Sequence, residues 1–378
     1  MKSLLFGAMI LFTVVSCRKI PHATVYSTYE FFVGTYTQNN NQGVNVITYN
    51  PNNQQFKVKE LITGLQNPSF VQYHSLTKNL FVSEEIGGEN GGKLNSFGFD
   101  AVNQKYQKTS TVNTQGDHPC VMALSPDKKW LIAGNYSGGN VSVFKIQENG
   151  MLSESLQTLQ HFGSSIHKER QEKPHIHDLV FHPTTQQLFV TDLGTDRIYI
   201  YDFEGESATP LSPSQPSFIS VKKGSGPRHL VFNITGEYLY VVQELTAEVS
   251  MYHLQENQIN FVQTLFLSSS PENMQQGSGA EIKMSPNQKY LYVSNRGKVN
   301  EIVVFAIDKS THQLIKIQNI SSGGQTPRSF EITPDGKYLL VANQDSHQIQ
   351  LFDIQSNGKL NPTAVSLNIN QPTHIINQ

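Results

Sequence analysis

The chain has little charge, little cysteine and no long apolar segment. Only 15% of its 378 residues are charged, against about 25% in typical soluble domains. The 28 basic and 30 acidic residues give a net charge of −2, which offers no electrostatic basis for binding nucleic acid. Two cysteines cannot build a disulfide scaffold or a cysteine-rich metal site. No apolar run approaches the roughly 20 residues that span a bilayer, which excludes an integral membrane bundle.

The N-terminus has the pattern of an export signal. An apolar run over residues 4–15 follows Lys2 and ends at Cys17 in the sequence Val-Val-Ser-Cys. The run is too short to cross a bilayer but suits the core of a signal peptide. Its end resembles the lipobox of bacterial lipoproteins, in which the cysteine is lipidated; the alternative is an ordinary secretory signal with an incidental cysteine. We predict a signal peptide over 1–17, lipidation at Cys17, a tether over 18–29, and a lipid-anchored protein on the periplasmic or cell-surface side of a bacterial membrane.

The remainder of the chain is a repeat of about 50 residues. Each unit has a short strand rich in Val, Ile, Tyr and Phe, a tight turn with Pro, Asn, Asp or Gly, and further strands, as over 227–252 and 327–352. These residue types favour strands and tight turns. The turn markers are spaced by 57, 51, 52 and 48 residues, at Pro126, Pro183, Ile234, Pro286 and Pro334. Such a period is typical of the four-stranded blades of a β-propeller.

The two ends of the chain complete one further unit. Six complete units are visible, while residues 31–36 and 44–49 look like a second and a third strand. Residues 372–376 look like a first strand with no successor. We therefore predict an all-β fold over 30–378, a seven-bladed propeller closed by the N-terminal strands together with the C-terminal strand. Closure removes the exposed sheet edges of an open array.

Several motifs of the repeat point to a known family. They are Gly226-Pro227-Arg228-His229, Glu244, Ser294-Asn295-Arg296-Gly297, and the segments 32–37 and 193–198. Together they resemble the lactonase family of seven-bladed propellers, which includes propeller-type 6-phosphogluconolactonases and fungal carboxymuconate lactonizing enzymes. The resemblance covers about residues 30–378. It implies that the catalytic His of the family corresponds to His177, its Arg and Glu to Arg228 and Glu244, and its later Arg to Arg296.

Aligned repeats also gather polar residues at one mouth of the channel. The first strand begins and the second strand ends on the same side of a blade, because a hairpin is antiparallel. The two sets of residues at this mouth are Ser69, Cys120, His177, Arg228, Ala280 and Arg328, and Tyr36, Glu85, Tyr136, Leu193, Glu244, Arg296 and Gln344. Three arginines among them predict a pocket for a small anionic lactone or carboxylate, because Arg donates in pairs to such groups. The alternative is that the charges pair with one another and seal the channel.

The residues at this mouth can be given roles in catalysis. The candidate catalytic residues are His177, Glu244, Arg228 and Arg296, and the candidate substrate-binding residues are His175, Arg328, Glu85, Tyr136 and His229. His177 is the expected base, kept neutral by the arginines; His175 lies on the same expected strand face and could replace it. Glu244 would orient water or His177, and the arginines would hold the carbonyl oxygen. We expect no metal or other cofactor, because the two histidines lack a third ligand and no phosphate loop is present.

The leading hypothesis is an enzyme of carbohydrate metabolism that hydrolyses a sugar lactone to an aldonic acid. No Ser or Cys has the partners of a nucleophile, so we expect direct attack by water. A muconate-type cycloisomerase or lyase would use the same groups. A non-catalytic propeller that binds a glycan or protein is the third possibility, favoured by Tyr36 and Tyr136 at the mouth. Export does not suit a phosphorylated cytosolic intermediate, so an unphosphorylated aldonolactone or uronic lactone is also open.

Overall fold

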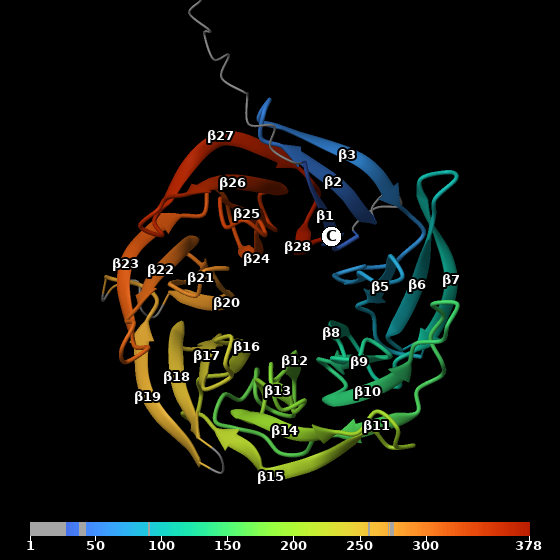
Figure 1. The fold of residues 1–378 in the computed structure, drawn as a ribbon. Coiled ribbons are helices and arrows are strands. Elements are labelled where there is room, and N and C mark those ends of the chain that lie inside the picture. Colours follow the sequence, from blue (N-terminus) through green and yellow to red (C-terminus); the bar gives the residue numbers. More distant parts are fainter. Residues whose placement is uncertain (1–27, 38–42, 90, 256–257, 271, 273–275) are drawn as a thin grey trace, which may run out of the picture.

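The fold is a closed ring of seven antiparallel sheets (Figure 1). The computed structural model describes residues 28–37, 43–89, 91–255, 258–270, 272 and 276–378. Each sheet has four strands, so the predicted all-β, seven-bladed propeller is confirmed. The predicted signal peptide, Cys17 and residues 18–27 lie outside the described residues. Over the part that is described, no helix is long and apolar enough to cross a membrane.

The blades follow one another around the ring. From the innermost strand outward, the first three blades are β28 (Pro372–Asn377), β1 (Tyr29–Thr35), β2 (Val44–Asn50), β3 (Gln55–Ile62); β4 (Phe70–His74), β5 (Asn79–Glu84), β6 (Lys93–Asp100), β7 (Lys105–Asn113); and β8 (Pro119–Leu124), β9 (Trp130–Asn135), β10 (Asn140–Lys145), β11 (Gln157–Gln160). The fourth and fifth blades are β12 (Ile176–Phe181), β13 (Leu188–Asp192), β14 (Arg197–Phe203), β15 (Leu211–Ser220); and β16 (Pro227–Phe232), β17 (Tyr238–Gln243), β18 (Glu248–Gln255), β19 (Gln258–Phe266). The sixth and seventh blades are β20 (Gly277–Met284), β21 (Tyr290–Gly297), β22 (Glu301–Ile307), β23 (Leu314–Ser321); and β24 (Pro327–Ile332), β25 (Tyr338–Asn343), β26 (Gln348–Ile354), β27 (Leu360–Asn368).

The turn between the first two strands of a blade has a repeated hydrogen-bond pattern. In the third blade Ser125 Oγ donates to Asp127 Oδ1 at 2.5 Å, and it accepts from the backbone N of Trp130 at 3.0 Å. The same pattern recurs over residues 285–290 and 333–338. Short polar side chains that bond nearby backbone favour turns over regular structure. This local chemistry explains why the turn residues mark the repeat in the sequence.

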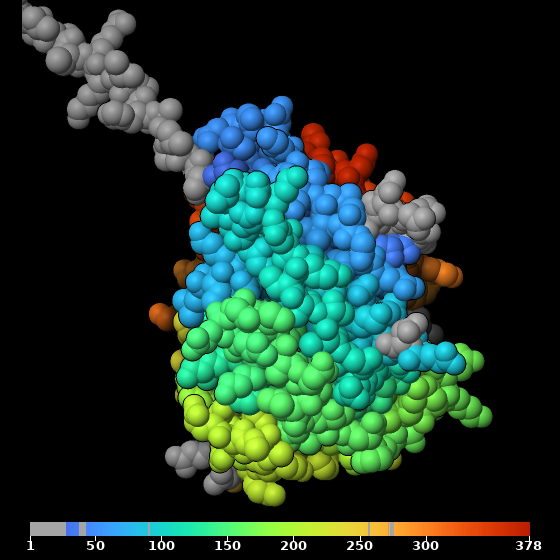
Figure 2. Space-filling view, turned by 90° about the vertical axis from the view of Figure 1, so that its right-hand side faces the viewer, coloured from blue at the N-terminus to red at the C-terminus, as the bar shows by residue number. Residues whose placement is uncertain are grey.

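The core lies between blades rather than inside any one of them. Ile132 of β9 and Val190 of β13, from the third and fourth blades, belong to one buried cluster. Figure 2 shows from the side how neighbouring blades stack directly against one another along the rim. Each sheet therefore buries its two faces against the sheets beside it, which is how a sheet with two apolar faces is satisfied.

The last strand closes the ring. β28 pairs antiparallel with β1, with Phe32 opposite Ile376, and the C-terminus lies beside β1 (Figure 1). Ile375 is fully buried in a cluster with Phe31 and Leu340, a residue of the seventh blade. The predicted sharing of one blade by both chain ends is therefore confirmed. β1 begins at Tyr29, one residue inside the predicted tether.

Candidate active site

Bulges in the innermost strands shape one mouth of the channel. In β8, β12, β16 and β24 the pairing with the next strand skips one residue: Cys120, His177, Arg228 and Arg328, respectively. A bulge bends its strand and changes the direction of the unpaired side chain. The repeat thus places a thiol, an imidazole and two guanidinium groups at equivalent positions of four blades.

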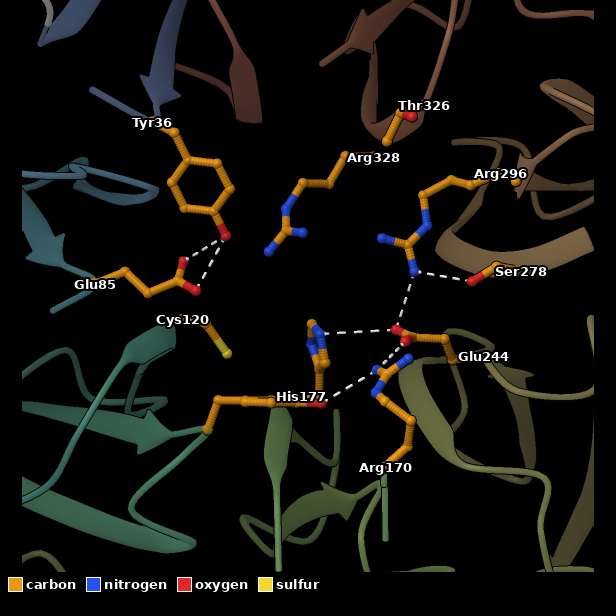
Figure 3. A pocket seen from close by; sticks show the side chains of 12 residues that line it. Tyr36, Glu85, Cys120, Arg170, His177, Glu244, Ser278, Arg296, Thr326 and Arg328 are labelled. Carbon is orange, nitrogen blue, oxygen red and sulfur yellow. Dashed lines mark hydrogen bonds and ion pairs between the residues drawn. The ribbon is translucent and has the colours of Figure 1, made fainter. Parts of the chain in front are cut away.

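A polar cavity of about 430 Å³ opens at this mouth. Eight residues of the two predicted sets line it: Tyr36, Glu85, Cys120, Tyr136, His177, Glu244, Arg296 and Arg328. Figure 3 shows Arg328 pointing into the space between Glu85 and Arg296, while Arg296, Arg170 and His177 converge on Glu244. The strand ends of separate blades are therefore brought together around one volume. Over the described ranges, no group of three or more His, Cys, Asp or Glu side chains could hold a metal ion.

Glu244 is the centre of an arginine cluster. Its Oε2 lies 2.9 Å from Arg228 Nε and 3.0 Å from Arg296 Nη2, and its Oε1 accepts from Arg170 Nη2 at 2.5 Å. The Nε2 atom of His177 is 4.0 Å from the same Oε2. Part of the charge is therefore paired within the site, as predicted by the alternative in which ion pairs seal the channel. The cavity nevertheless remains open beside these pairs.

The surroundings set the protonation states of the two central groups. Burial alone would raise the pKa of Glu244, but Arg296, Arg228 and Arg170 together lower it to about 2. Burial lowers the pKa of His177 well below 6.5, and the positive charge of Arg228 lowers it further. At neutral pH the site therefore presents a carboxylate and a neutral imidazole.

The opposite wall carries Glu85, Tyr36 and Cys120. The Tyr36 hydroxyl donates to the Glu85 carboxylate, with 3.0 Å to each oxygen, and the Arg328 guanidinium lies 5.2 Å from the Tyr36 ring centre. Burial raises the pKa of the Cys120 thiol, which donates to the Ile176 carbonyl at 3.5 Å. Cys120 thus remains a thiol at neutral pH, and a thiol is a poor nucleophile.

Several predicted site residues lie outside the lining of this cavity. Arg228 is only 1% exposed and lies behind Glu244, and Leu193 is fully buried. His175 precedes β12 and is not part of the lining; its ring stacks on Tyr136 at 4.4 Å, and the His177 ring contacts the same Tyr136 at 5.4 Å. Ser69 and His229 line a second, smaller chamber that adjoins the cavity.

Two further residues of the predicted sets also lie outside the lining. Ala280 contributes only its carbonyl, which accepts from Arg228 Nη1 at 2.7 Å. Gln344 is not among the lining residues.

Arg170 is a lining residue that the sequence reasoning missed. It lies in the segment 161–175 between β11 and β12, outside the aligned strands, and also donates to the Tyr136 hydroxyl at 3.2 Å. The segment is held on the fourth blade by His161, whose ring contacts Asp192 and the Tyr201 hydroxyl. The one signal in the sequence was the 57-residue spacing from Pro126 to Pro183, the longest of the repeat, which indicates an insertion.

The chain is similar to known proteins over most of its length. The model of the family described as lactonase, 7-bladed beta-propeller matches residues 30–377. This chain belongs to that family. It is 31% identical over 343 residues to a 6-phosphogluconolactonase of Formosa agariphila, covering 90% of this chain and 96% of the relative. It is 27% identical over 323 residues to the 6-phosphogluconolactonase of Bacillus subtilis, covering 85% and 90%.

A solved structure gives the same fold. The periplasmic gluconolactonase of Pseudomonas aeruginosa superimposes with a TM-score of 0.86 and is 32% identical, with 93% of this chain and 99% of that chain covered. The expected family and fold are thereby confirmed.

Proposed function

We propose that this protein hydrolyses a sugar lactone to an aldonic acid in the arginine-rich cavity, as a 6-phosphogluconolactonase-like enzyme. The observation that carries the proposal is the convergence of a neutral imidazole, a carboxylate and guanidinium groups on one open cavity. Lactone opening needs a base for water, a cation for the oxyanion and groups that hold the substrate. The names of the related proteins support the same reaction class.

In the proposed reaction the nucleophile is a water molecule. His177 Nε2 takes a proton as the water oxygen attacks the lactone carbonyl carbon, and the carbonyl oxygen becomes an oxyanion beside Arg296 and Arg328. The bond between the carbonyl carbon and the ring oxygen then breaks, and the ring oxygen receives the proton from His177. Glu244, 4.0 Å from His177 Nε2, would stay ionised and accept a hydrogen bond from the other O–H of the water, which orients it. No covalent intermediate forms, in keeping with the protonated Cys120.

Substrate binding would make His177 a better base. Its pKa is lowered by burial and by the nearby arginines. An anionic group bound between Arg296 and Arg328 offsets that positive charge, so the imidazolium becomes less unfavourable. A general base is most effective when its pKa lies near the working pH. The basicity of His177 would thus be greatest when the anionic substrate is in place.

The charge balance favours an anionic substrate. Among the lining residues, three guanidinium groups (Arg170, Arg296 and Arg328) face two carboxylates, Glu85 and Glu244, leaving a formal charge of 3 − 2 = +1. Arg328 has no hydrogen bond or ion pair with any described residue and remains available for a phosphate or carboxylate. A phosphorylated aldonolactone satisfies both features, and an unphosphorylated aldonolactone or uronic lactone would use Arg328 for the oxyanion alone.

We propose that the reaction takes place outside the cytoplasm. The apolar run and Cys17 support export with a lipid anchor, and the similar gluconolactonase of P. aeruginosa is periplasmic. The membrane would be contacted through the anchor, and the charge pattern gives no nucleic-acid partner.

The test is hydrolysis of 6-phosphogluconolactone and of glucono-lactone by the purified protein, with spontaneous opening subtracted. Turnover should fall by at least about 100-fold in His177→Ala and in the His177→Ala/Glu244→Ala double variant. The matched control is His253→Ala, because His253 stacks on Tyr238 in the outer part of its blade. The ratio of the two rates shows whether the phosphate is recognised. No turnover of either lactone by a folded protein would contradict the proposal and favour a muconate-type reaction or a binding propeller.

A further inference from the structure

A second layer of polar residues lies directly behind the arginine cluster. Residues that follow one another in a strand normally point to opposite faces. The bulge at Arg228 changes this, so that Arg228 Nη1 lies 3.2 Å from Nε2 of the next residue, His229. His229, Glu281, Ser329 and His374 line the small chamber that adjoins the cavity. They come from the innermost strands of three neighbouring blades and from β28.

Arg228 has a protein partner on each side. It is 1% exposed, and its Nη1 donates to the Ala280 carbonyl at 2.7 Å and to His229 Nε2 at 3.2 Å. On the other side its Nε forms the ion pair with Glu244. A buried guanidinium is tolerated when its charge and donors are matched in this way.

The contacts of His229 define its tautomer. Its Nδ1 lies 2.9 Å from Glu281 Oε1, and a carboxylate can only accept. Nδ1 must then carry the hydrogen, and Nε2 is free to accept from Arg228. Glu281 is held in turn, because Ser329 Oγ donates to its Oε2 at 3.2 Å and the backbone N of Ile282 donates to its Oε1 at 3.1 Å.

We propose that Glu281 and His229 are positioning residues that hold Arg228, and through it Glu244, in the reactive arrangement. The proposal rests on the proposed lactonase function. The other two partners of Glu244 are more accessible: the side chain of Arg170 is 41% exposed and that of Arg296 is 13% exposed. Both can turn toward an anionic substrate. Arg228 cannot, because the Glu281–His229 pair holds it from behind, so it keeps the Glu244 carboxylate in place while substrate binds.

Two substitutions at one position separate this role from simple packing. His229→Gln keeps an atom near the position of Nε2 that can accept from Arg228, whereas His229→Asn keeps one near Nδ1 that can donate to Glu281. We expect His229→Gln to retain kcat within about threefold. His229→Asn should lower kcat about 10- to 100-fold and change KM less than about threefold, because a misplaced reactive group costs that much in rate. His374→Asn is the matched control, since this histidine of the same chamber stacks on Phe70 at 3.8 Å and should leave kcat unchanged.

The melting temperature of each variant is measured on the same samples, so that a loss of kcat can be told apart from a loss of folded protein. Equal kcat values for His229→Gln and His229→Asn, or a loss confined to KM, would overturn the proposal. So would an equal loss in His374→Asn, because it would show a general effect of opening the chamber.

A second measurement does not depend on turnover. Nitrogen NMR of the histidine-labelled protein, with the His229 signals identified by their loss in His229→Gln, should show hydrogen on Nδ1 and none on Nε2 at neutral pH. Hydrogen on Nε2 would overturn the proposal, because Arg228 could not then donate to it. If the wild-type protein hydrolyses no lactone, the proposed function fails, while this result still decides the positioning contact.

Discussion

Replacing Glu244 by Gln removes the one carboxylate that three guanidinium groups share. The side chain keeps its size, while the charge that faces Arg170, Arg228 and Arg296 is lost. Because the pKa of Glu244 is lowered from 4.5 to about 2, its ionised form is stabilised in the fold by about 3 kcal/mol at about 1.4 kcal/mol per tenfold. The side chain is only 5% exposed, so solvent screens little of this. We expect Glu244→Gln to destabilise the fold by about 3 kcal/mol at pH 7.

The size of the loss can be converted into a melting temperature. For the roughly 350 residues of the propeller, an unfolding entropy of about 2.1 cal/mol/K per residue gives about 0.7 kcal/mol/K. A loss of about 3 kcal/mol therefore lowers Tm by about 4 °C at pH 7. Phosphate should restore part of the loss, because an anion that binds the folded state near the unpaired arginines stabilises it.

The pH dependence gives a sharper test. A lowered pKa contributes stability that is fully present above 4.5 and is lost as the pH falls through about 2. The Tm difference between wild type and Glu244→Gln should therefore be constant above pH 5 and shrink below pH 4.5. Glu84→Gln is the control, since buried Glu84 accepts from the Gln66 backbone N and from Asn95 Nδ2. A Tm for Glu244→Gln within about 1 °C of wild type at pH 7 would refute the electrostatic reasoning.

Three further predictions concern the cavity and the closure of the ring. Arg328→Met should lower kcat about 100- to 1,000-fold by removing an oxyanion donor without lowering Tm, since it loses no ion pair among the described residues; steady-state rates and melting curves check this, and a loss below tenfold would contradict the role. The acidic limb of kcat/KM should have its midpoint below pH 6.5, because His177 must be neutral to act and its pKa is lowered; a midpoint at or above 6.5 in the pH profile would exclude it as the base. Ile375→Ala should cost about 2–5 kcal/mol, seen as a fall in Tm of about 3–7 °C, and an unchanged Tm would show that β28 does not hold the ring closed.

The fold could be predicted from local chemistry. The turn around Ser125 and Asp127 recurs because the same short side chains bond the same backbone groups. The strands alternate with these turns at a regular spacing, and the unmatched first strand near Ile375 indicated closure. These features depend on neighbours in the chain, and neighbours can be read from a sequence.

Some of the residues that form the candidate site were predictable for the same reason. The alignment placed His177 at the start of a first strand and Glu244 and Arg296 at the ends of second strands, and in a symmetric ring these positions meet around one mouth of the channel. Arg170 could not be found in this way, because it lies in an insertion that has no counterpart in the other repeats.

The depth of each side chain was decided by tertiary structure alone. A bulge adds one residue to a strand, and nothing in the residue types at 227–229 shows that Arg228 is the unpaired one. That one-residue shift places Arg228 behind Glu244 instead of in the cavity. It also sends His229 toward Glu281, a residue 52 positions away in the chain. By itself the sequence determined the ring and the residue types at its mouth, because these follow from local patterns. Strand register and packing between blades decided which side chains line the cavity and which ones support them from behind. A sequence does not show these features directly, because they bring together residues that are far apart in the chain.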